Sequence, residues 1–450
     1  MKKHSQILGF IILTVFCSCG ERESTPVTAP PLTTIAATNT NTNTSSSLFD
    51  DNKVHTIKVN FDNKEFWDSL VNYKNLKDSL LISNYMLCNV EIDGEKIDSS
   101  GISIKGESSY DFYPTKKKSF KIGFNKFIKG KKYQKFKKIS LNNNFKDPTM
   151  MREKIMLDFI RRQGLPALRS SYTRLYLNDV YWGLYLVVEE IDSKFLATNF
   201  ANDSIGNLYK GEPQAELTWH GDNVENYSRR YKKETNEKEN NWKDFIRFIR
   251  TINDNSDEET YRNNLEKIFN IDNCLKIWAI NNLFVNVDAY NMLYPHNYFL
   301  YHNPATDKFE WISYDFNYGF AAWNSKYDLS RVENFDILFV KQPVELNPFT
   351  EKLLINNKFF RKKYLDIMNE LVNDQFTEQY LFSRMDEISA LISKDVYADS
   401  QKMYSNEDFD NNIIEALGDI YDPGAYIPGL KPFVVQRRES VLSQLAKINK

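Results

Sequence analysis

The sequence predicts a mixed α+β domain, in which a β-rich first part is followed by a helical second part. Between residues 54 and 190, apolar and polar residues alternate in several short segments, as is typical of strands. After residue 240, apolar residues recur at the three- and four-residue spacing that is typical of helices. Hydrophobic residues make up 42% and aromatic residues 14% of the 450 positions, which is enough for a large core.

The composition argues against several classes of protein. The formal net charge is -2, so no one-signed field over the whole molecule would attract nucleic acid or an anionic membrane. We therefore expect no nucleic-acid partner, and any basic site must be local. Cys88 and Cys274 stand alone in the body of the chain, without a CxxC or Cys/His cluster, so we expect each to be a buried apolar residue.

The first residues have the layout of a secretory signal. Lys2 and Lys3 precede a mostly apolar run at 7–16, which is shorter than the roughly 20 residues that span a bilayer as a helix. Cys17-Ser18-Cys19-Gly20 follows and resembles a bacterial lipobox, so we predict a signal peptide at 1–18 and lipidation at Cys19. Ordinary signal cleavage without a lipid is the alternative.

A linker separates this leader from the folded body. Residues 24–53 are dominated by Thr, Ser, Asn and Pro and cannot bury enough apolar surface to fold. We predict a lipid anchor and disordered tether at 19–53 and a folded domain at 54–450. The protein would then lie in the cell envelope, facing the periplasm or the exterior, with contact to the membrane through the anchor only.

The first part of the body is predicted to be strands with two helices. Asp93-Gly94 is a typical hairpin turn, and Asp147-Pro148-Thr149 and Gly164 are typical start and stop signals of a helix. In chain order we expect a strand at 57–61, a helix at 64–70, a hairpin at 90–97, strands at 101–105 and 119–124, a helix from Asp147 to about Gln163, and a hairpin of strands at 172–177 and 181–188.

The second part is predicted to be mostly helical. A polar loop at 213–240 is followed by three helices, whose apolar stripes include Trp242, Tyr261 and Trp278. The third helix should extend to about Val287. A short hairpin, 298–301 against 309–314, interrupts the helices, which resume from about Phe349 to the C-terminus.

This order of elements matches the two lobes of protein kinases, with an N-lobe at about 54–190 and a C-lobe at about 191–450. Many other α+β proteins share the order, so function has to be argued from particular residues. Phosphoryl transfer needs cations for the phosphates, carboxylate and amide oxygens for Mg²⁺, and one group that orients the attacking hydroxyl.

Two segments offer cations for phosphates. The strand at Gly101–Lys105 runs into the small-residue turn Gly106-Glu107-Ser108-Ser109, whose backbone N–H groups could face phosphate oxygens, although a simple β-turn is the alternative. The run from Lys116 to Lys138 contains 11 Lys and no acidic residue, mostly as a solvated face. Alternation places Lys121 on a strand, opposite apolar neighbours, and makes it the first candidate for phosphate contact, with Lys118 second. Lys105 is a further candidate.

Three oxygen-bearing residues form the best constellation. Asp288 is expected at a helix end, Asn297 at the start of the hairpin at 298–314 and Asp315 just after its second strand. The order matches the catalytic Asp, metal Asn and metal Asp of kinases, but the first interval is longer than in ordinary kinases. From spacing alone, a helix cap and turn residues explain the three equally well.

Ordered motifs along the body resemble the spore coat protein H (CotH) family, a group of atypical protein kinases typified by an enzyme that phosphorylates serines on spore coat proteins with ATP. The motifs run over more than 200 residues in the same order as in the family. They are Gly101–Ser109, Lys117–Lys121, Asp147–Arg152, Leu175–Asn178, Gly183–Leu186, Glu189–Asp192, Gly206–Lys210, Asn286-x-Asp288, Asn297-Tyr298 and Asp315.

The resemblance implies a role for each matched residue. It implies Asp288 as the residue that orients the substrate hydroxyl, and Asn297 with Asp315 as ligands of Mg²⁺ or Mn²⁺. It implies Lys121 for phosphate contact and Glu189 near the adenine or hinge of bound ATP. Arg152 would either bind phosphate or support the lobe. The implied acceptor is a Ser or Thr of a cell-envelope or secreted protein.

Two departures from the family pattern keep a second function open. Asn317 stands where family members often have a second Asp, and Glu107 places a carboxylate where phosphates should approach. ATP is also scarce outside the cytoplasm. The alternative is therefore a weakly active or inactive surface protein that binds or assembles through the same fold. Polysaccharide binding has little support, because most aromatic residues fall at core spacing.

Overall fold

The computed structural model describes residues 47–80, 85–200, 205–323, 332–343 and 347–448. All of these belong to one compact unit, Ser46–Lys450. The predicted signal peptide at 1–18, the lipidation site Cys19 and most of the predicted tether lie outside the described residues. In the described part of the chain, no helix is both long enough and apolar enough to cross a membrane.

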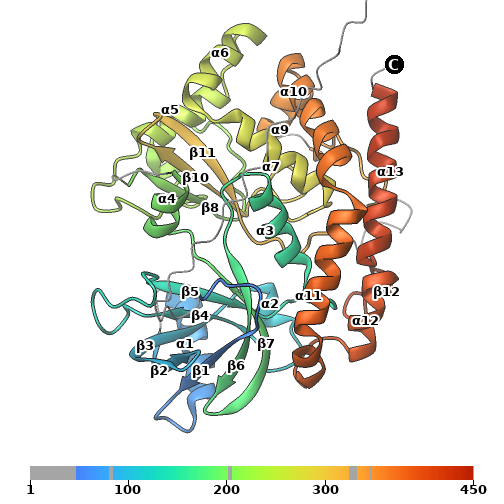
Figure 1. Cartoon of the computed structure of the whole chain (residues 1–450). Coiled ribbons are helices and arrows are strands. Elements are labelled where there is room, and N and C mark those ends of the chain that lie inside the picture. The colour runs from blue at the N-terminus through green and yellow to red at the C-terminus, as the bar shows by residue number, and fades with distance from the viewer. Residues whose placement is uncertain (1–46, 81–84, 201–204, 324–331, 344–346, 449–450) are drawn as a thin grey trace, which may run out of the picture. The chain divides into compact units, whose positions relative to one another are not determined.

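Seven strands form a closed barrel in the first half of the chain (Figure 1). Their order around the barrel is β1-β2-β3-β4-β5-β7-β6, and the parallel pairing of β1 with β6 closes it. The strands are β1 His55–Asn60, β2 Met86–Ile92, β3 Glu95–Lys105, β4 Ser119–Gly123, β5 Lys138–Asn142, β6 Ser170–Leu177 and β7 Val180–Val188. Three helices accompany them: α1 Phe66–Leu80, α2 Ser108–Asp111 and α3 Arg152–Arg162.

Alternation along the strands separates an apolar interior from a polar face. On β3, β4 and β5 the buried interior side chains are Ile102, Ile104, Phe120, Ile122, Ile139 and Leu141. The residues between them point the other way, so Lys105, Lys121 and Ser140 share one face. The sequence-based assignment of Lys121 to the side opposite Phe120 and Ile122 is confirmed.

The predicted hairpin at 90–97 is present, and its turn residues Asp93 and Gly94 have φ values of 50° and 89°. The strand expected separately at 101–105 is instead the end of β3, which is 11 residues long. The expectation was wrong because the polar residues Asp98-Ser99-Ser100 have the composition of a turn between two strands. In the structure Ser99 takes a φ of 50°, and a register shift in β2 opposite lets the pairing continue.

A four-stranded sheet of order β11-β10-β8-β9 lies in the second half, with helices around it (Figure 1). These elements are α4 Ser193–Phe200, β8 Leu208–Gly211, β9 Tyr231–Lys233, α5 Lys243–Ile252, α6 Glu258–Ile268, α7 Ile271–Leu283, β10 Tyr298–Asn303 and β11 Lys308–Ser313. The expected polar loop at 213–240 contains β9, which is too short to show periodicity. α7 ends before the predicted Val287, because Val285 takes a left-handed φ of 46°.

The C-terminal quarter is helical, as predicted. Its helices are α9 Pro348–Leu354, α10 Lys358–Glu370, α11 Glu378–Ala398, α12 Asn406–Ile414 and α13 Leu430–Ile448, and a small hairpin pairs β12 Leu417–Gly418 with β13 Tyr426–Ile427. Helix α11 packs against both α13 and barrel strand β7 (Figure 1). Helix α11 therefore connects the barrel to the C-terminal helices through packing contacts.

The packed chain begins earlier than the expected boundary at Val54. Leu48 is fully buried in the barrel core. Its backbone N–H donates to Gln134 Oε1 (2.9 Å), and its carbonyl oxygen accepts from Ser171 Oγ (2.6 Å). One apolar side chain at the end of a polar stretch gives little periodic signal, which explains the difference. Cys88 and Cys274 are free and buried, as predicted.

Candidate active site

Asp288, Asn297 and Asp315 come together beside the four-stranded sheet. Asp288 follows α7, Asn297 immediately precedes β10, and Asp315 lies two residues after β11. The pairing of Tyr298 with Ser313 brings the ends of the hairpin together. Asn297 and Asp315 have left-handed φ values of 60° and 63°. Non-glycine residues take such values at an energetic cost, and they cluster at functional sites.

Two hydrogen-bond donors hold the Asp288 carboxylate. The amide nitrogen Nδ2 of Asn297 donates to Asp288 Oδ2 (2.9 Å) and to its backbone oxygen (2.8 Å). His296 Nε2 lies 2.7 Å from Asp288 Oδ1. Burial alone would lower the pKa of His296, but the Asp288 carboxylate raises it overall. Because Asn297 uses Nδ2 for these bonds, its carbonyl oxygen Oδ1 is the atom that could bind a cation.

Lys105, at the end of β3, brings a positive charge from the barrel to these residues. Its Nζ donates to Asn142 Oδ1 (2.8 Å) and Ser140 Oγ (3.2 Å) on β5. Burial, and then the charge of Lys121, lower the pKa of Lys105, while Asp315 and nearby glutamates oppose this decrease. The ammonium group therefore lies within electrostatic reach of acids from both halves of the chain.

Glu153, in the first turn of α3, completes the cluster. It is buried and accepts a hydrogen bond from Asn142 Nδ2 at its Oε2 (2.7 Å). Burial, followed by repulsion from Asp315, raises the pKa of Glu153 to about 7. The pKa of Asp315 is also raised, first by burial and then by Asp288, although Lys105 opposes this.

Asp315 is exposed to solvent, although protein atoms crowd its carboxylate. Like charges that raise one another's pKa would be stabilised by a bound cation. Within the described residues, no group of three His, Cys, Asp or Glu side chains is arranged to hold a metal. One or two carboxylates with an amide oxygen suit Mg²⁺, which usually completes its shell with phosphate oxygens and water.

Lys121 lies one strand away from Lys105 and has a protein partner. Its Nζ is 2.9 Å from Glu190 Oε2, which also lies 3.3 Å from Lys138 Nζ. Burial would raise the pKa of Glu190, but the neighbouring lysines lower it strongly. The preceding residue, Glu189, points elsewhere and pairs with Arg169 (2.6 Å).

The structure places Lys118 and Arg152 apart from the cluster. Lys118 Nζ donates to the carbonyl oxygens of Tyr110 (2.7 Å) in α2 and of Tyr113 (2.8 Å) just after it. Arg152 is fully buried, and its guanidinium group donates to protein oxygens on three segments. These are Asp147 Oδ1 (2.6 Å), Asn412 Oδ1 (2.8 Å) and the carbonyl of Pro428 (2.8 Å).

The two residues that depart from the family pattern lie in different settings. Glu107 is exposed and precedes the short helix α2. Asn317 is half-buried, and its Nδ2 donates to the carbonyl oxygen of Phe145 at 3.5 Å.

The sequence-based reasoning gave no role to four polar residues at the site: Glu153, Glu190, His296 and Lys210. Lys210, on β8, acts electrostatically on both Asp315 and His296. Glu153 and Glu190 each follow a charged residue that we had singled out, and neighbours on a helix or strand point in different directions. Their adjacency to Arg152 and Glu189 was the available signal.

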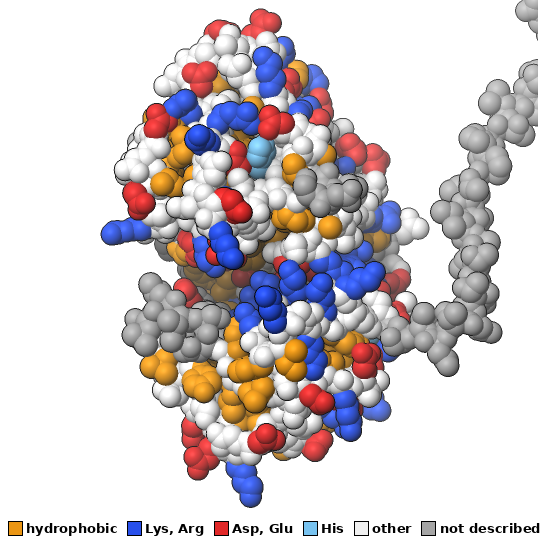
Figure 2. Space-filling model, turned by 90° about the vertical axis from the view of Figure 1, so that its left-hand side faces the viewer, with side chains coloured by type: hydrophobic (Ala, Val, Ile, Leu, Met, Phe, Trp, Pro, Cys, Tyr) orange, Lys and Arg blue, Asp and Glu red, His pale blue; other side chains and the backbone are white. Residues whose placement is uncertain are grey.

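A cavity of about 390 Å³ lies beside Glu190 and Lys138. Its barrel side is lined by Asn125, Lys126, Lys137 and Lys138, and its other side by residues 191–193 and 234–236. Lys and Arg side chains gather at the waist of this face of the molecule (Figure 2).

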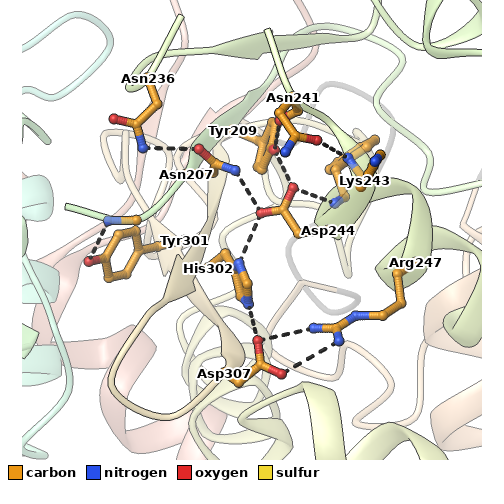
Figure 3. A network of polar contacts seen from close by, with 12 residues as sticks. Asn207, Tyr209, Asn236, Asn241, Lys243, Asp244, Arg247, Tyr301, His302 and Asp307 are labelled. Carbon is orange, nitrogen blue, oxygen red and sulfur yellow. Dashed lines mark hydrogen bonds and ion pairs between the residues drawn. The ribbon is translucent and has the colours of Figure 1, made fainter. Parts of the chain in front are cut away.

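A polar network holds the wall of this cavity in place (Figure 3). Asn236, at the cavity, donates from Nδ2 to Asn207 Oδ1 (3.1 Å), and Asn207 Nδ2 donates to Asp244 Oδ2 (2.9 Å). The same carboxylate lies 3.0 Å from His302 Nδ1. The cavity wall is thus coupled to α5 and β10.

Comparisons with known proteins agree on one family. A family model described as CotH kinase protein matches residues 102–440. Inner spore coat protein H of Bacillus subtilis is 25% identical over 337 residues, which cover 71% of this chain and 84% of that protein. Invasin CotH2 of Rhizopus delemar is 23% identical over 261 residues, which cover 56% of this chain but only 43% of the invasin.

Proposed function

The chain belongs to the CotH kinase protein family, and we propose that it is an exported, ATP- and metal-dependent protein kinase acting on Ser or Thr of cell-envelope or secreted proteins. One observation carries this proposal. Lys105 and Glu153, from the barrel half, lie within electrostatic range of Asp315, from the second half, and Asp315 in turn interacts electrostatically with Asp288. A cationic strand residue, a helix glutamate and two aspartates are the groups that kinases use.

We assign roles from the contacts of each side chain. Asp288, oriented by Asn297 and His296, would accept a hydrogen bond from the acceptor hydroxyl. Asp315 and Asn297 Oδ1 would hold Mg²⁺ or Mn²⁺, which when bound neutralises charge on the phosphates. Lys105 is the stronger candidate for phosphate contact, because Lys121 is paired with Glu190.

The architecture is consistent with a two-lobe kinase. The barrel would act as the N-lobe, and residues 189–193, after β7, would correspond to the hinge. The cavity of about 390 Å³ is lined by residues 191–193, so we assign the nucleoside of ATP to it. The names of the relatives, a spore coat protein and an invasin, favour a location at the cell surface.

The second candidate function is a surface protein that binds or assembles without catalysis. Glu107 and Asn317 favour it, because one adds a negative charge near the proposed phosphates and the other removes a potential metal carboxylate. The name of the Rhizopus delemar relatives, invasin, also describes an interaction and no reaction.

Two measurements on residues 46–450 distinguish these functions. With labelled ATP and Mg²⁺ or Mn²⁺, a kinase should label itself or a protein acceptor, and Asp315→Asn should abolish labelling. The exposed Asp62→Asn is the matched control. In a thermal-shift titration, ATP with metal at 100 times Kd should stabilise the fold by about 2.7 kcal/mol. A thermal shift without labelling would indicate a nucleotide-binding pseudokinase. The absence of both the shift and the labelling would refute the proposal.

A further inference from the structure

The connection between β4 and β5, residues 125–137, is a strongly basic surface loop. We call it the basic loop. It contains six Lys and no acidic residue. Lys126, Lys129, Lys132 and Lys135 are exposed. Lys and Arg side chains gather at the waist of the face of the molecule that Figure 2 shows. The chain has a net charge of -2, so this concentration of charge is local.

Two large apolar side chains project from the same loop. Phe127 and Ile128 are 48% and 46% exposed and lie between Lys126 and Lys129. The cavity of about 390 Å³ is lined by Lys126 but by neither of them. Adjacent exposed apolar residues ringed by lysines are unusual on a surface that contacts only water.

The base of the loop is anchored, so the exposure of its tip is not a sign of poor packing. Tyr133 and Phe136 are buried, at 3% and 4%, and their backbones exchange hydrogen bonds of 3.0 and 2.7 Å. Lys131 donates to the carbonyl oxygen of Asp98. The loop therefore presents Phe127 and Ile128 from a fixed support.

The lysines around the tip keep their charge available. Among the described residues, no ion-pair partner lies within reach of Lys129, Lys132 or Lys135. Lys126 packs its amine over the Tyr85 ring at 4.3 Å from the centroid. The positive charges of these lysines are therefore available to a partner with dense negative charge.

We propose that the basic loop docks on an anionic lipid surface, with Phe127 and Ile128 entering the headgroup region and the lysines contacting lipid phosphates. A fluid lipid surface accepts side chains that protrude, and anionic headgroups attract nearby Lys and Arg. A polypeptide partner would instead need to supply a groove for the two apolar side chains. The docking depends neither on a lipid anchor nor on kinase activity, and it places the cavity wall at Lys126 next to the membrane.

The test is a partition measurement with residues 46–450 and two kinds of vesicle, phosphatidylcholine alone and phosphatidylcholine with phosphatidylglycerol. Binding should need phosphatidylglycerol and weaken as salt rises. The triple variant Lys129→Gln/Lys132→Gln/Lys135→Gln should bind about 100-fold less, because each Lys near an anionic surface contributes about fivefold. Phe127→Ser/Ile128→Ser should bind at least about tenfold less.

Matched controls use residues of the same kinds elsewhere on the surface. Lys64→Gln/Lys238→Gln/Lys447→Gln removes three exposed lysines, and Ile414→Ser/Ile420→Ser removes two apolar side chains that are 63% and 67% exposed. Both should bind like the wild type, and all variants should keep the wild-type thermal transition. Equal binding to both vesicles, or equal losses in the controls, would overturn the proposal. So would binding of soluble polyglutamate by the loop without any binding to vesicles, which would identify a polypeptide partner.

Discussion

The ammonium group of Lys105 is surrounded by protein, and burial disfavours its charged form. Burial and Lys121 lower its pKa, and the acids Asp315 and Glu153 act in the other direction. Its hydrogen bonds to Asn142 and Ser140 aim it along the polar face of the barrel. A cation held between acids of both halves is well placed to meet phosphates once a metal occupies the acidic side.

We therefore expect Lys105→Met to impair the proposed reaction more than Lys121→Met. Loss of Lys105 should lower kcat/KM for ATP about 100-fold, the usual effect of removing one preorganised electrostatic contact. Loss of Lys121 should lower kcat/KM for ATP about tenfold or less, because the ammonium group of Lys121 already forms an ion pair with Glu190. Initial rates with labelled ATP measure both. A larger loss for Lys121 would restore the sequence-based assignment.

Some site residues could be predicted from sequence, and others could not. Asp288, Asn297 and Asp315 were singled out because a helix end and a hairpin bring such positions together, and the family resemblance then favoured them over simple cap and turn residues. Glu153 was missed because only the tertiary structure shows that it faces Asp315 while Arg152 faces away. The partners of Arg152 lie about 260 and 276 residues further along the chain, a distance over which local patterns carry no signal.

At the scale of elements, a partly buried polar network joins α5, β8 and β10 (Figure 3). Asp244 on α5 accepts from Tyr209 OH (2.7 Å) on β8 and lies 3.0 Å from His302 Nδ1 on β10. His302 Nε2 lies 2.9 Å from Asp307 Oδ1, which also pairs with Arg247. The network fixes the helix against the sheet that carries the site.

The network should make stability depend on pH. The hydrogen bond to Asp244 raises the pKa of His302 above 6.5, although burial opposes it. Its contribution is then complete below pH 6.5 and is lost as pH rises through the raised value. Burial alone would raise the pKa of Asp244, but its hydrogen bonds lower it below 3.8, so its contribution is lost only in acid.

We expect His302→Asn to destabilise the protein by about 1.5–3 kcal/mol near pH 5–6, the usual contribution of a hydrogen bond to a charged group. The difference from wild type should shrink above the raised pKa of His302. Urea unfolding at a series of pH values measures it. A difference that stays constant from pH 5 to 9 would show that packing alone explains the loss. The control is the exposed Asn236→Ala, which changes the same network without removing a titrating group.

The order of the elements was predictable, but some of their boundaries were not. The helices of the second half gave clear apolar periods, and all three predicted hairpins are present. β9 has only three residues, which is too few to show a period in the sequence. The end of α7 depends on the left-handed backbone at Val285, which no propensity favours for a β-branched residue.

For the whole molecule, the fully buried pair of Lys117 and Asp399 joins the barrel half to the C-terminal helices. Lys117 precedes β4, Asp399 follows α11, and their Nζ and Oδ2 atoms lie 2.6 Å apart. Asp399 also accepts from the backbone N–H groups of Leu184 and Gln401, each at 3.0 Å. One carboxylate thus holds three segments.

Removing one charge from this pair should destabilise the whole chain. Lys117→Met leaves the Asp399 carboxylate buried without its cation, which we expect to cost about 3–5 kcal/mol in urea unfolding. Adding Asp399→Asn should recover part of that loss, because the amide oxygen still accepts from the backbone and no charge remains buried. Lys362→Met, in an exposed pair with Asp366, should cost at most about 1 kcal/mol. If the double variant were less stable than Lys117→Met, the pair would owe its effect to packing, and the C-terminal helices would be joined to the barrel chiefly by their apolar contacts.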